Sequence, residues 1–449
     1  MKTAYNGYTI ALADTANTVT VIRAGRRQNI SIPPVSRIRV TGEICPANDP
    51  FETFQYAKSK KWRIAPLSSR TDPTRVYTVP GAVDIAGMRV SLVDDQGNKT
   101  ALDPGKDYTV EPQFAWIAPG QAPDSVNNRY SLDYTMRMQR VDVIAEKDGE
   151  IRLFTGSEAL VCPPWPLLDP RWTGLARIYQ RFTDKLDESA VYPIYRPAYG
   201  RTINFQVRSD RSARMPGQAD VNEPSETDNP LWPQVIDYSR YLSGSAQAFA
   251  RLRDRFARAN KFSMVYFGDS ITQGGDVPPD LRFTRRFSRY LKEYAPQKHL
   301  TFHNAAVGGT NSIYGRERFD RDVLAHNPDA VTILFALNDR TMDDRTFLEN
   351  HNYFIDRLNE INAVPILLTS NMNTGSRMAG LDRAEERIRA LSRTRELVCL
   401  DAYGIWKALP EYGIPYETLL SNGINHPDGI AVGVFFELLK MAFSDKTVE

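Results

Sequence analysis

The chain has 449 residues, in which Lys and Arg (56) nearly balance Asp and Glu (54), and hydrophobic residues make up 42%. At about 150 residues per domain, this length predicts two or three domains, and the composition is that of a folded globular protein. The balanced charge excludes a chain-wide basic surface of the kind that binds nucleic acid or an anionic membrane. We therefore expect neither partner.

The N-terminus and the cysteines bear on compartment and on metal binding. The apolar run Ile10–Ala13 is far shorter than the ~7–15 residues of a signal-peptide core, and no apolar stretch approaches the ~20 residues of a membrane span. We expect a soluble protein without a signal peptide, cytoplasmic by default. Cys45, Cys162 and Cys399 lie far apart and form no Cys/His cluster, so we expect no metal site and small buried cysteines.

Residues 1–160 are predicted to form a β-rich domain. Short runs of β-forming residues recur between turn residues, which is typical of a sandwich or barrel in one or two modules. The expected strands are Tyr8–Ala13, Val19–Arg23, Arg37–Thr41, Arg75–Val79, Met88–Val93, Tyr108–Val110, Tyr130–Met136, Val141–Ala145 and Ile151–Phe154. Residues 161–236 are predicted to form a β extension with a strand at Ile203–Arg208, followed by a proline-rich linker over Ser209–Pro233.

From residue 237 to 449 the hydrophobic period changes. Apolar β runs alternate with amphipathic helices, which predicts an α/β domain with a parallel sheet covered on both faces. Sites in such sheets lie at the carboxyl ends of the strands. The expected strands are Phe262–Phe267, Leu300–His303, Ala330–Leu337, Val364–Ser370 and Leu397–Leu400. The expected helices are Ser243–Asn260, Arg282–Tyr294, Arg316–Ala325, Asp344–Ile361, Asp382–Arg395, Ala402–Leu409 and Ile430–Phe443.

Candidate catalytic residues gather in this last part, which holds all five histidines. Three predicted strands end in small and polar residues: Gly268-Asp269-Ser270, Asn304 to Gly308-Gly309, and Asn338-Asp339. A fourth loop, Asn422 to His426-Pro427, precedes the last helix. Because these loops share one edge of a parallel sheet, we expect them to converge.

The residue types suit acyl transfer. A serine needs a base to lose its proton, and His426 is the candidate base for Ser270. The N–H groups of Ser270 and Gly309 and the side-chain amide of Asn338 are candidate donors to an oxyanion. Asp269 is expected to shape the nucleophile turn, and both Asp269 and Gly308 are expected to lie against the substrate.

These four segments resemble, in order, the motif blocks of the SGNH hydrolases, the GDSL esterase/lipase superfamily. The resemblance covers about residues 245–445. It implies a flavodoxin-like three-layer α/β/α fold and ester hydrolysis without a metal or other cofactor. SGNH domains joined to β modules resemble carbohydrate O-acetylesterases, which implies an acylated carbohydrate as the substrate.

The sequence departs from the family pattern in two places. Ala336 replaces the usual glycine of the third block. Asn422 and Gly423 stand where an aspartate usually precedes the histidine, and an asparagine can orient the imidazole but carries no charge to stabilise its cation. Three alternatives follow: a Ser270–His426 dyad oriented by Asn422 or by a backbone carbonyl, another acid such as Asp428 in the orienting role, or a weakened or inactive site. The intact nucleophile and oxyanion positions favour the dyad.

We expect a serine esterase that works through an acyl-Ser270 intermediate. The alternative is a non-catalytic glycan-binding or structural protein that keeps the fold. His299, His326 and His351 are expected on the surface, and His303 as a structural residue at the end of its strand.

Overall fold

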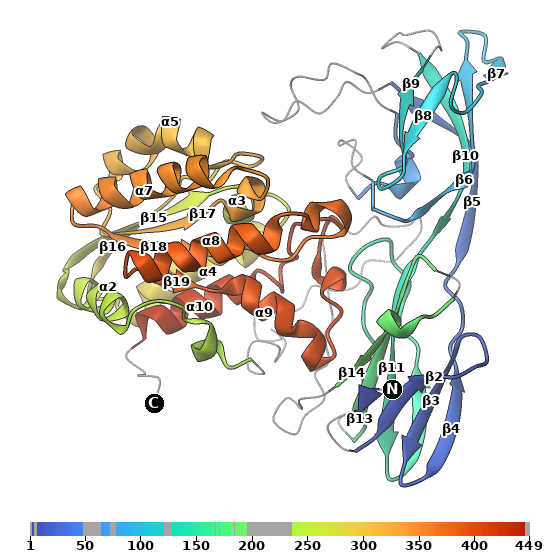
Figure 1. Cartoon of the computed structure of the whole chain (residues 1–449), viewed down its shortest axis with the longest axis horizontal. Helices are drawn as coiled ribbons and strands as arrows, with labels where there is room; N and C mark the ends of the chain where they lie inside the picture. The colour runs from blue at the N-terminus through green and yellow to red at the C-terminus, as the bar shows by residue number, and fades with distance from the viewer. Residues whose placement is uncertain are drawn as a thin grey trace. The chain divides into compact units, whose positions relative to one another are not determined.

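The structure is a computed structural model that describes residues 2–3, 7–47, 64–71, 78–120, 128–166, 168–169, 171–183, 185–194 and 236–444. The chain divides into two compact units (Figure 1). Unit 1 comprises Met1–Trp232 with Leu409–Ile424, and unit 2 comprises Pro233–Ala408 with Asn425–Glu449. Residues 409–424 thus fold with the N-terminal part, whereas we expected one uninterrupted domain from residue 237. The strand and linker expected over 203–233 lie outside the described residues.

Unit 1 contains a β-sandwich. One antiparallel sheet has the order β1-β2-β3-β4 and the other has the order β12-β11-β13-β14. Ile10 and Val21 of the first sheet share a core with Ile144, Leu175 and Ile178 of the second, so the two sheets pack face to face. The strands are β1 (Lys2–Thr3), β2 (Thr9–Leu12), β3 (Thr18–Arg23), β4 (Arg26–Ser31), β11 (Gln139–Lys147), β12 (Glu150–Phe154), β13 (Thr173–Arg181) and β14 (Val191–Pro193).

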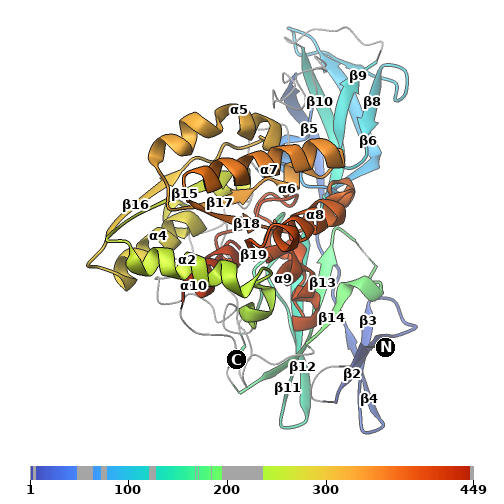
Figure 2. The same ribbon diagram turned by 60° about the vertical axis from the view of Figure 1, so that its left-hand side comes forward.

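A second core of unit 1 lies around another antiparallel sheet, with the order β5-β10-β6-β7, and the hairpin β8-β9. Only Met138 separates β10 from β11, so one extended run of chain passes from this sheet into the sandwich (Figure 2). The strands are β5 (Arg37–Pro46), β6 (Val83–Val93), β7 (Lys99–Ala101), β8 (Tyr108–Glu111), β9 (Trp116–Pro119) and β10 (Arg129–Arg137). The short helices of residues 2–194 are η1 (Leu67–Ser69) and η2 (Glu188–Ala190).

Strands β4 and β13 of unit 1 were not predicted from the sequence. Strand β4 begins with two arginines and exposes most of its side chains, because it forms the edge of its sheet. Strand β13 pairs with β11 and β14 inside its sheet. The chain up to β14 is therefore part of the sandwich and not an extension of it.

Buried contacts explain why residues 409–424 fold with unit 1. The fully buried guanidinium of Arg177 lies 4.5 Å from the ring centre of Trp165 and donates to the carbonyl of Gly413 (2.9 Å). Farther along, Gly423 has a φ of +66°, and a Cβ there would lie 2.9 Å from Val79 Cγ1, so a larger residue would be strained. The segment contains η8 (Leu409–Tyr412) and η9 (Tyr416–Leu419).

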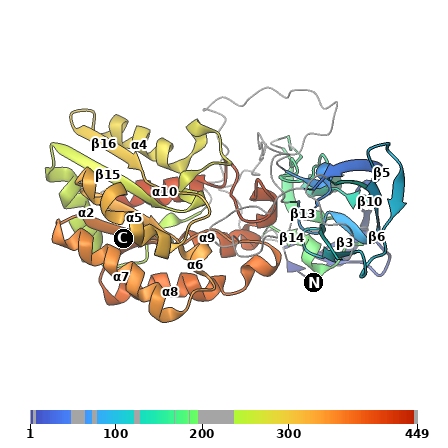
Figure 3. The same ribbon diagram turned by 90° about the horizontal axis from the view of Figure 1, so that it is seen from above.

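Unit 2 is a three-layer α/β/α structure, as predicted. Its five strands are all parallel, in the order β16-β15-β17-β18-β19. Side chains of β15 alternate between the faces: Phe267 packs on Phe319 and Phe354, and Tyr266 packs on Phe283. Figure 3 shows α7 and α8 on one side of the strands and α4 on the other. The strands are β15 (Lys261–Gly268), β16 (His299–Asn304), β17 (Ala330–Leu334), β18 (Val364–Leu368) and β19 (Val398–Leu400).

The helices of unit 2 are α2 (Ala246–Arg258), α3 (Ser270–Gln273), α4 (Phe283–Tyr294), α5 (Ser312–Asp322), α6 (Ala336–Asp339), α7 (Asp344–Glu360), α8 (Leu381–Thr394), α9 (Ala402–Ala408) and α10 (Gly433–Phe443), with the short η4 (Tyr238–Tyr241), η5 (Pro279–Leu281), η6 (Leu324–His326) and η7 (Gly375–Met378). Among the described residues, no helix has both the length and the apolar run needed to cross a bilayer. Because the chain turns to opposite sides after β15 and β16, the sheet has a topological switch point there, where ligands bind in such folds.

Candidate active site

Ser270 stands at the carboxyl end of β15, as the first residue of α3. Gly268 ends the strand, and a Cβ at this position would lie 2.7 Å from the Leu334 carbonyl of β17. The preceding residue, Asp269, caps α3 by accepting the N–H of Ile271 (3.0 Å). The tight turn therefore presents the half-exposed Ser270 at the sheet edge.

His426 lies beside this serine, with its Nε2 2.9 Å from Ser270 Oγ. Two contacts fix the loop that carries the histidine. Asn371, after β18, donates to the Asn425 carbonyl (2.8 Å), and Asp428 accepts the N–H of Ala431 (2.7 Å) ahead of α10. The backbone is thus held by hydrogen bonds both before and after His426 in the sequence.

The other imidazole nitrogen, Nδ1 of His426, forms a short hydrogen bond with Oδ2 of Asp276. Both side chains are mostly buried, with 16% of His426 and 9% of Asp276 exposed. Carboxylate, imidazole and hydroxyl therefore form a continuous chain. This is the arrangement that orients a histidine to take a proton from a serine and stabilises the imidazolium that forms.

A tight turn places Asp276. Gly274 ends α3 with a φ of +68°, and its carbonyl accepts the N–H of Val277 (3.1 Å). Arg282 donates from Nε to the Val277 carbonyl (3.2 Å). The turn returns Asp276 toward the nucleophile, six residues after it.

Asp276 replaces the orienting residues that the sequence suggested. Asn422 folds with unit 1, and its Oδ1 accepts the N–H of Ile424 (2.9 Å). Asp428 uses Oδ1 for the backbone ahead of α10, as described above. The expected role of Asn422, and of Asp428 as an alternative acid, is therefore corrected: the carboxylate at Nδ1 belongs to Asp276. The family pattern directs attention to the residues before the histidine, and it missed an acid in the nucleophile loop.

The candidate oxyanion donors also meet at this edge. Gly309 has a φ of +75°, and among the described residues nothing accepts the N–H of Gly309 or of Ser270. The Asn338 amide donates to the Thr310 carbonyl (2.8 Å), with Asp269 Oδ2 farther away at 3.4 Å. Asn338 therefore joins the loops of Ser270 and Gly309.

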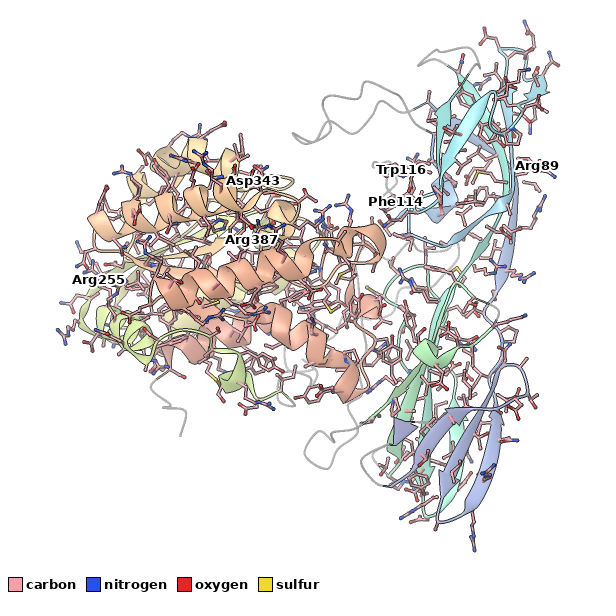
Figure 4. All side chains as sticks on the ribbon, in the orientation of Figure 1. Arg89, Phe114, Trp116, Arg255, Asp343 and Arg387 are labelled. Carbon is pink, nitrogen blue, oxygen red and sulfur yellow. The ribbon has the colours of Figure 1, made fainter. Side chains whose placement is uncertain are left out.

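The third block differs in secondary structure from the expectation. Strand β17 ends at Leu334, and residues 336–339 form α6, whereas a strand was expected through Leu337. A helical backbone accepts the Cβ of Ala336 where the family has glycine. Arg387, labelled in Figure 4, donates to the carbonyl of Asp339 (3.1 Å) and holds α6 from α8.

Buried carboxyl groups surround this edge. Burial raises the pKa of Asp269 to about 7, with the nearby Asp339 adding to the effect. Burial likewise raises the pKa of Asp339 and of Asp428, each to about 7. These groups resist ionisation below neutral pH. Asp269 caps α3 through its bond to Ile271, whereas the carboxylate at His426 is that of Asp276.

The remaining histidines lie elsewhere in unit 2. His351 is fully buried and its Nδ1 bonds the Phe347 carbonyl (2.9 Å). The expectation of a surface residue was wrong, because His351 occupies the core-facing side of α7. His303 and His326 are exposed and stack with ring centres 3.8 Å apart. The three cysteines are buried, as expected. In the described ranges no cluster of His, Cys, Asp and Glu could hold a metal ion.

Comparison with known proteins agrees with the motif resemblance. Residues 266–429 match the model of the GDSL-like Lipase/Acylhydrolase family; the C-terminal part of the chain is thus a GDSL-like region. A curated relative, the uncharacterized lipoprotein YqeF of Bacillus subtilis (strain 168), is 32% identical over 115 residues, which are 24% of this chain and 47% of that protein. The chain thus spans about half the length of this relative.

Solved structures also align with parts of the chain. A two-domain esterase (CEX) active on acetylated mannans is 20% identical with a TM-score of 0.39, over 48% of this chain and 58% of that one. Axe2, an acetyl xylan esterase from Geobacillus stearothermophilus, is 14% identical with a TM-score of 0.36, over 42% and 97%. A lipase/acylhydrolase from Enterococcus faecalis is 23% identical with a TM-score of 0.33, over 40% and 93%.

Proposed function

We propose that the protein is a serine ester hydrolase that uses Ser270, His426 and Asp276 as its catalytic triad. The observation that supports this most strongly is the continuous hydrogen-bonded chain from the Asp276 carboxylate through both nitrogens of His426 to Ser270 Oγ. A purely structural serine in the first turn of α3 would require neither the histidine nor the carboxylate.

In this proposal, Ser270 Oγ attacks the ester carbonyl while His426 Nε2 takes the hydroxyl proton. The N–H groups of Ser270 and Gly309 and the Asn338 amide stabilise the oxyanion. His426 then gives the proton to the leaving alcohol, and acyl-Ser270 remains. His426 next removes a proton from water, which attacks the acyl group. His426 then returns this proton to Ser270 Oγ as the bond to the serine breaks, which releases the carboxylic acid and restores the free serine.

We propose an acetylated or otherwise short-acylated carbohydrate as the substrate. Gly308 lies against the nucleophile with Gln273 beside it, and both residues are exposed. One is small and the other polar, which suits a polar alcohol better than a long lipid chain. The alternative of a weakened or non-catalytic protein was motivated by Asn422. It loses that support, because Asp276 supplies the charge that Asn422 lacks.

The test is hydrolysis of p-nitrophenyl acetate by the full chain and by Ser270→Ala, together with labelling by a fluorophosphonate. We expect turnover that disappears in the variant, and one adduct, located on Ser270 by mass spectrometry. Full activity of Ser270→Ala, or no turnover and no adduct in the unmodified protein, would overturn the proposal. Acetylated oligosaccharides, with acetate release as the readout, then test the substrate class.

A further inference from the structure

We propose that Gln273 is a positioning residue that holds the oxyanion loop, residues 305–310, in its working geometry. This inference rests on the proposed esterase function and extends it to a residue outside the triad and the oxyanion donors. Gln273 is the last residue of α3, one helical turn after Ser270, and its side chain is exposed.

The contact that carries the proposal joins Gln273 Oε1 to the N–H of Gly308 (3.1 Å). Gly308 lies directly against the nucleophile, because a Cβ built on it would be 3.6 Å from Ser270 Cβ and 2.6 Å from Gln273 Oε1. The next residue, Gly309, carries the N–H assigned to the oxyanion. The Gly308 N–H belongs to the peptide group just before the one that carries the Gly309 N–H. Holding the first peptide group therefore restricts the directions in which the Gly309 N–H can point.

Other hydrogen bonds hold the loop on either side of this peptide. Val307 donates to the Gly268 carbonyl (3.1 Å), Asn304 donates to the Thr272 carbonyl (3.1 Å), and Thr310 Oγ1 donates to the Val307 carbonyl (2.7 Å). The Gln273 bond is the contact made to Gly308 itself. Loss of this bond should leave the loop folded but should allow the Gly309 N–H a wider range of orientations.

The chemistry of the amide fits this role. A carbonyl oxygen of glutamine accepts the Gly308 N–H without adding a negative charge beside a developing oxyanion. A carboxylate in the same place would accept as well but would repel that charge. If the side chain of residue 273 pointed only into solvent, an amide and a carboxylate there would affect the reaction equally.

A double-mutant cycle with Gln273→Met and Gly308→Ala tests the contact. Methionine keeps the length of the side chain but has no strong acceptor. Alanine is compatible with the Gly308 backbone, whose φ lies outside the left-handed region, but its Cβ displaces Gln273 Oε1. We expect each change alone to lower kcat about tenfold with little change in KM, a part of the 10²–10³-fold expected when a donor is lost.

The two changes should not be cumulative, because both break the same contact. The kcat of the double variant should lie within about threefold of the kcat of the less active single variant. The matched control is Gln247→Met, an exposed glutamine on α2, which should match the unmodified protein. A Gln273→Met enzyme with unchanged kcat, or effects that multiply in the double variant, would overturn the proposal.

Hydrogen exchange separates failure of this inference from failure of the proposed function. In the ligand-free protein, Gln273→Met should speed amide exchange in residues 305–310 and leave exchange in α7 unchanged. If the unmodified protein hydrolyses no ester, the esterase function fails, and with it the catalytic role of Gln273; exchange then reports on the contact alone. If the esterase is active but neither kcat nor exchange responds to Gln273→Met, only this inference fails.

Discussion

Asp276 and His426 are 150 residues apart in the sequence, and their side chains share a hydrogen bond at the edge of the parallel sheet. Asp276 lies in the turn that follows the nucleophile helix, and His426 lies in the loop before α10. The acid and the nucleophile therefore belong to one short piece of chain, while the base comes from another. Asn422, four residues before His426, stands where the family pattern has its aspartate, and it folds with unit 1.

The side-chain amide of Asn338 should contribute strongly to kcat and little to substrate binding. We expect Asn338→Ala to lower kcat for p-nitrophenyl acetate by about 10²–10³-fold, because one oxyanion donor is lost. Asn338 also bonds the Thr310 carbonyl, so thermal unfolding must accompany the kinetics. A stable variant whose kcat stays within threefold of the unmodified enzyme would show that Asn338 is not a donor.

The stability of the protein should fall as pH rises from about 4 to about 7. Asp269, Asp339 and Asp428 each have a folded-state pKa raised by burial to about 7, from an ordinary value near 4. Between about pH 4 and pH 7 the folded protein holds protons that the unfolded chain has released, so the free energy of unfolding decreases over this window.

Asp428→Asn isolates one of these groups. Asparagine can still accept the backbone N–H groups ahead of α10, and it removes a carboxyl that must ionise while buried. We expect the fall in Tm between pH 5 and pH 8 to be smaller in this variant by about 2 °C or more. The control is Asp382→Asn, since Lys407 lowers the pKa of Asp382. An unchanged pH dependence in Asp428→Asn would contradict the account.

Arg177 should control the segment that leads to the catalytic histidine. The chain leaves unit 1 at Ile424, two residues before His426, and Arg177 fastens that segment at Gly413. We expect Arg177→Met to speed hydrogen exchange in residues 409–424. We also expect it to lower kcat several-fold when activity is measured at a temperature at which the variant is still folded.

Arg140→Met is the matched control for this prediction. Arg140 is a buried arginine of the same unit and pairs with Asp142, so its loss should also destabilise unit 1. It bonds no residue of 409–424 among its described partners. Equal effects of the two changes on exchange in 409–424 and on kcat would mean that Arg177 has no special role.

The sequence predicted unit 2 well, because its strands and helices carry strong periodic patterns and its motifs stand at strand ends. Ser270, Gly309, Asn338 and His426 could therefore be placed at one sheet edge. The end of β17 could not, since the apolar run from Ala330 continues through Leu337 while the backbone turns into a helix.

Two features depended on contacts that no local pattern reveals. Asp276 is a single acid in a glycine-containing turn, and only the folded loops bring it to His426. Residues 409–424 join unit 1 through partners such as Arg177, 236 residues before Gly413. Strand β13 was missed for a related reason: it lies inside its sheet between β11 and β14, yet its side chains include the buried polar residues Arg177 and Gln180.

The most direct test of the triad compares Asp276→Asn with Asn422→Asp in p-nitrophenyl acetate hydrolysis at neutral pH. The account predicts that Asp276→Asn lowers kcat by a factor on the order of 10⁴. The imidazole of His426 then has no charged partner to stabilise its cation, and it is no longer held in the tautomer that can accept the serine proton. It also predicts that Asn422→Asp leaves kcat within a few-fold of the unmodified enzyme. A large gain in rate for Asn422→Asp, with Asp276→Asn fully active, would contradict the account.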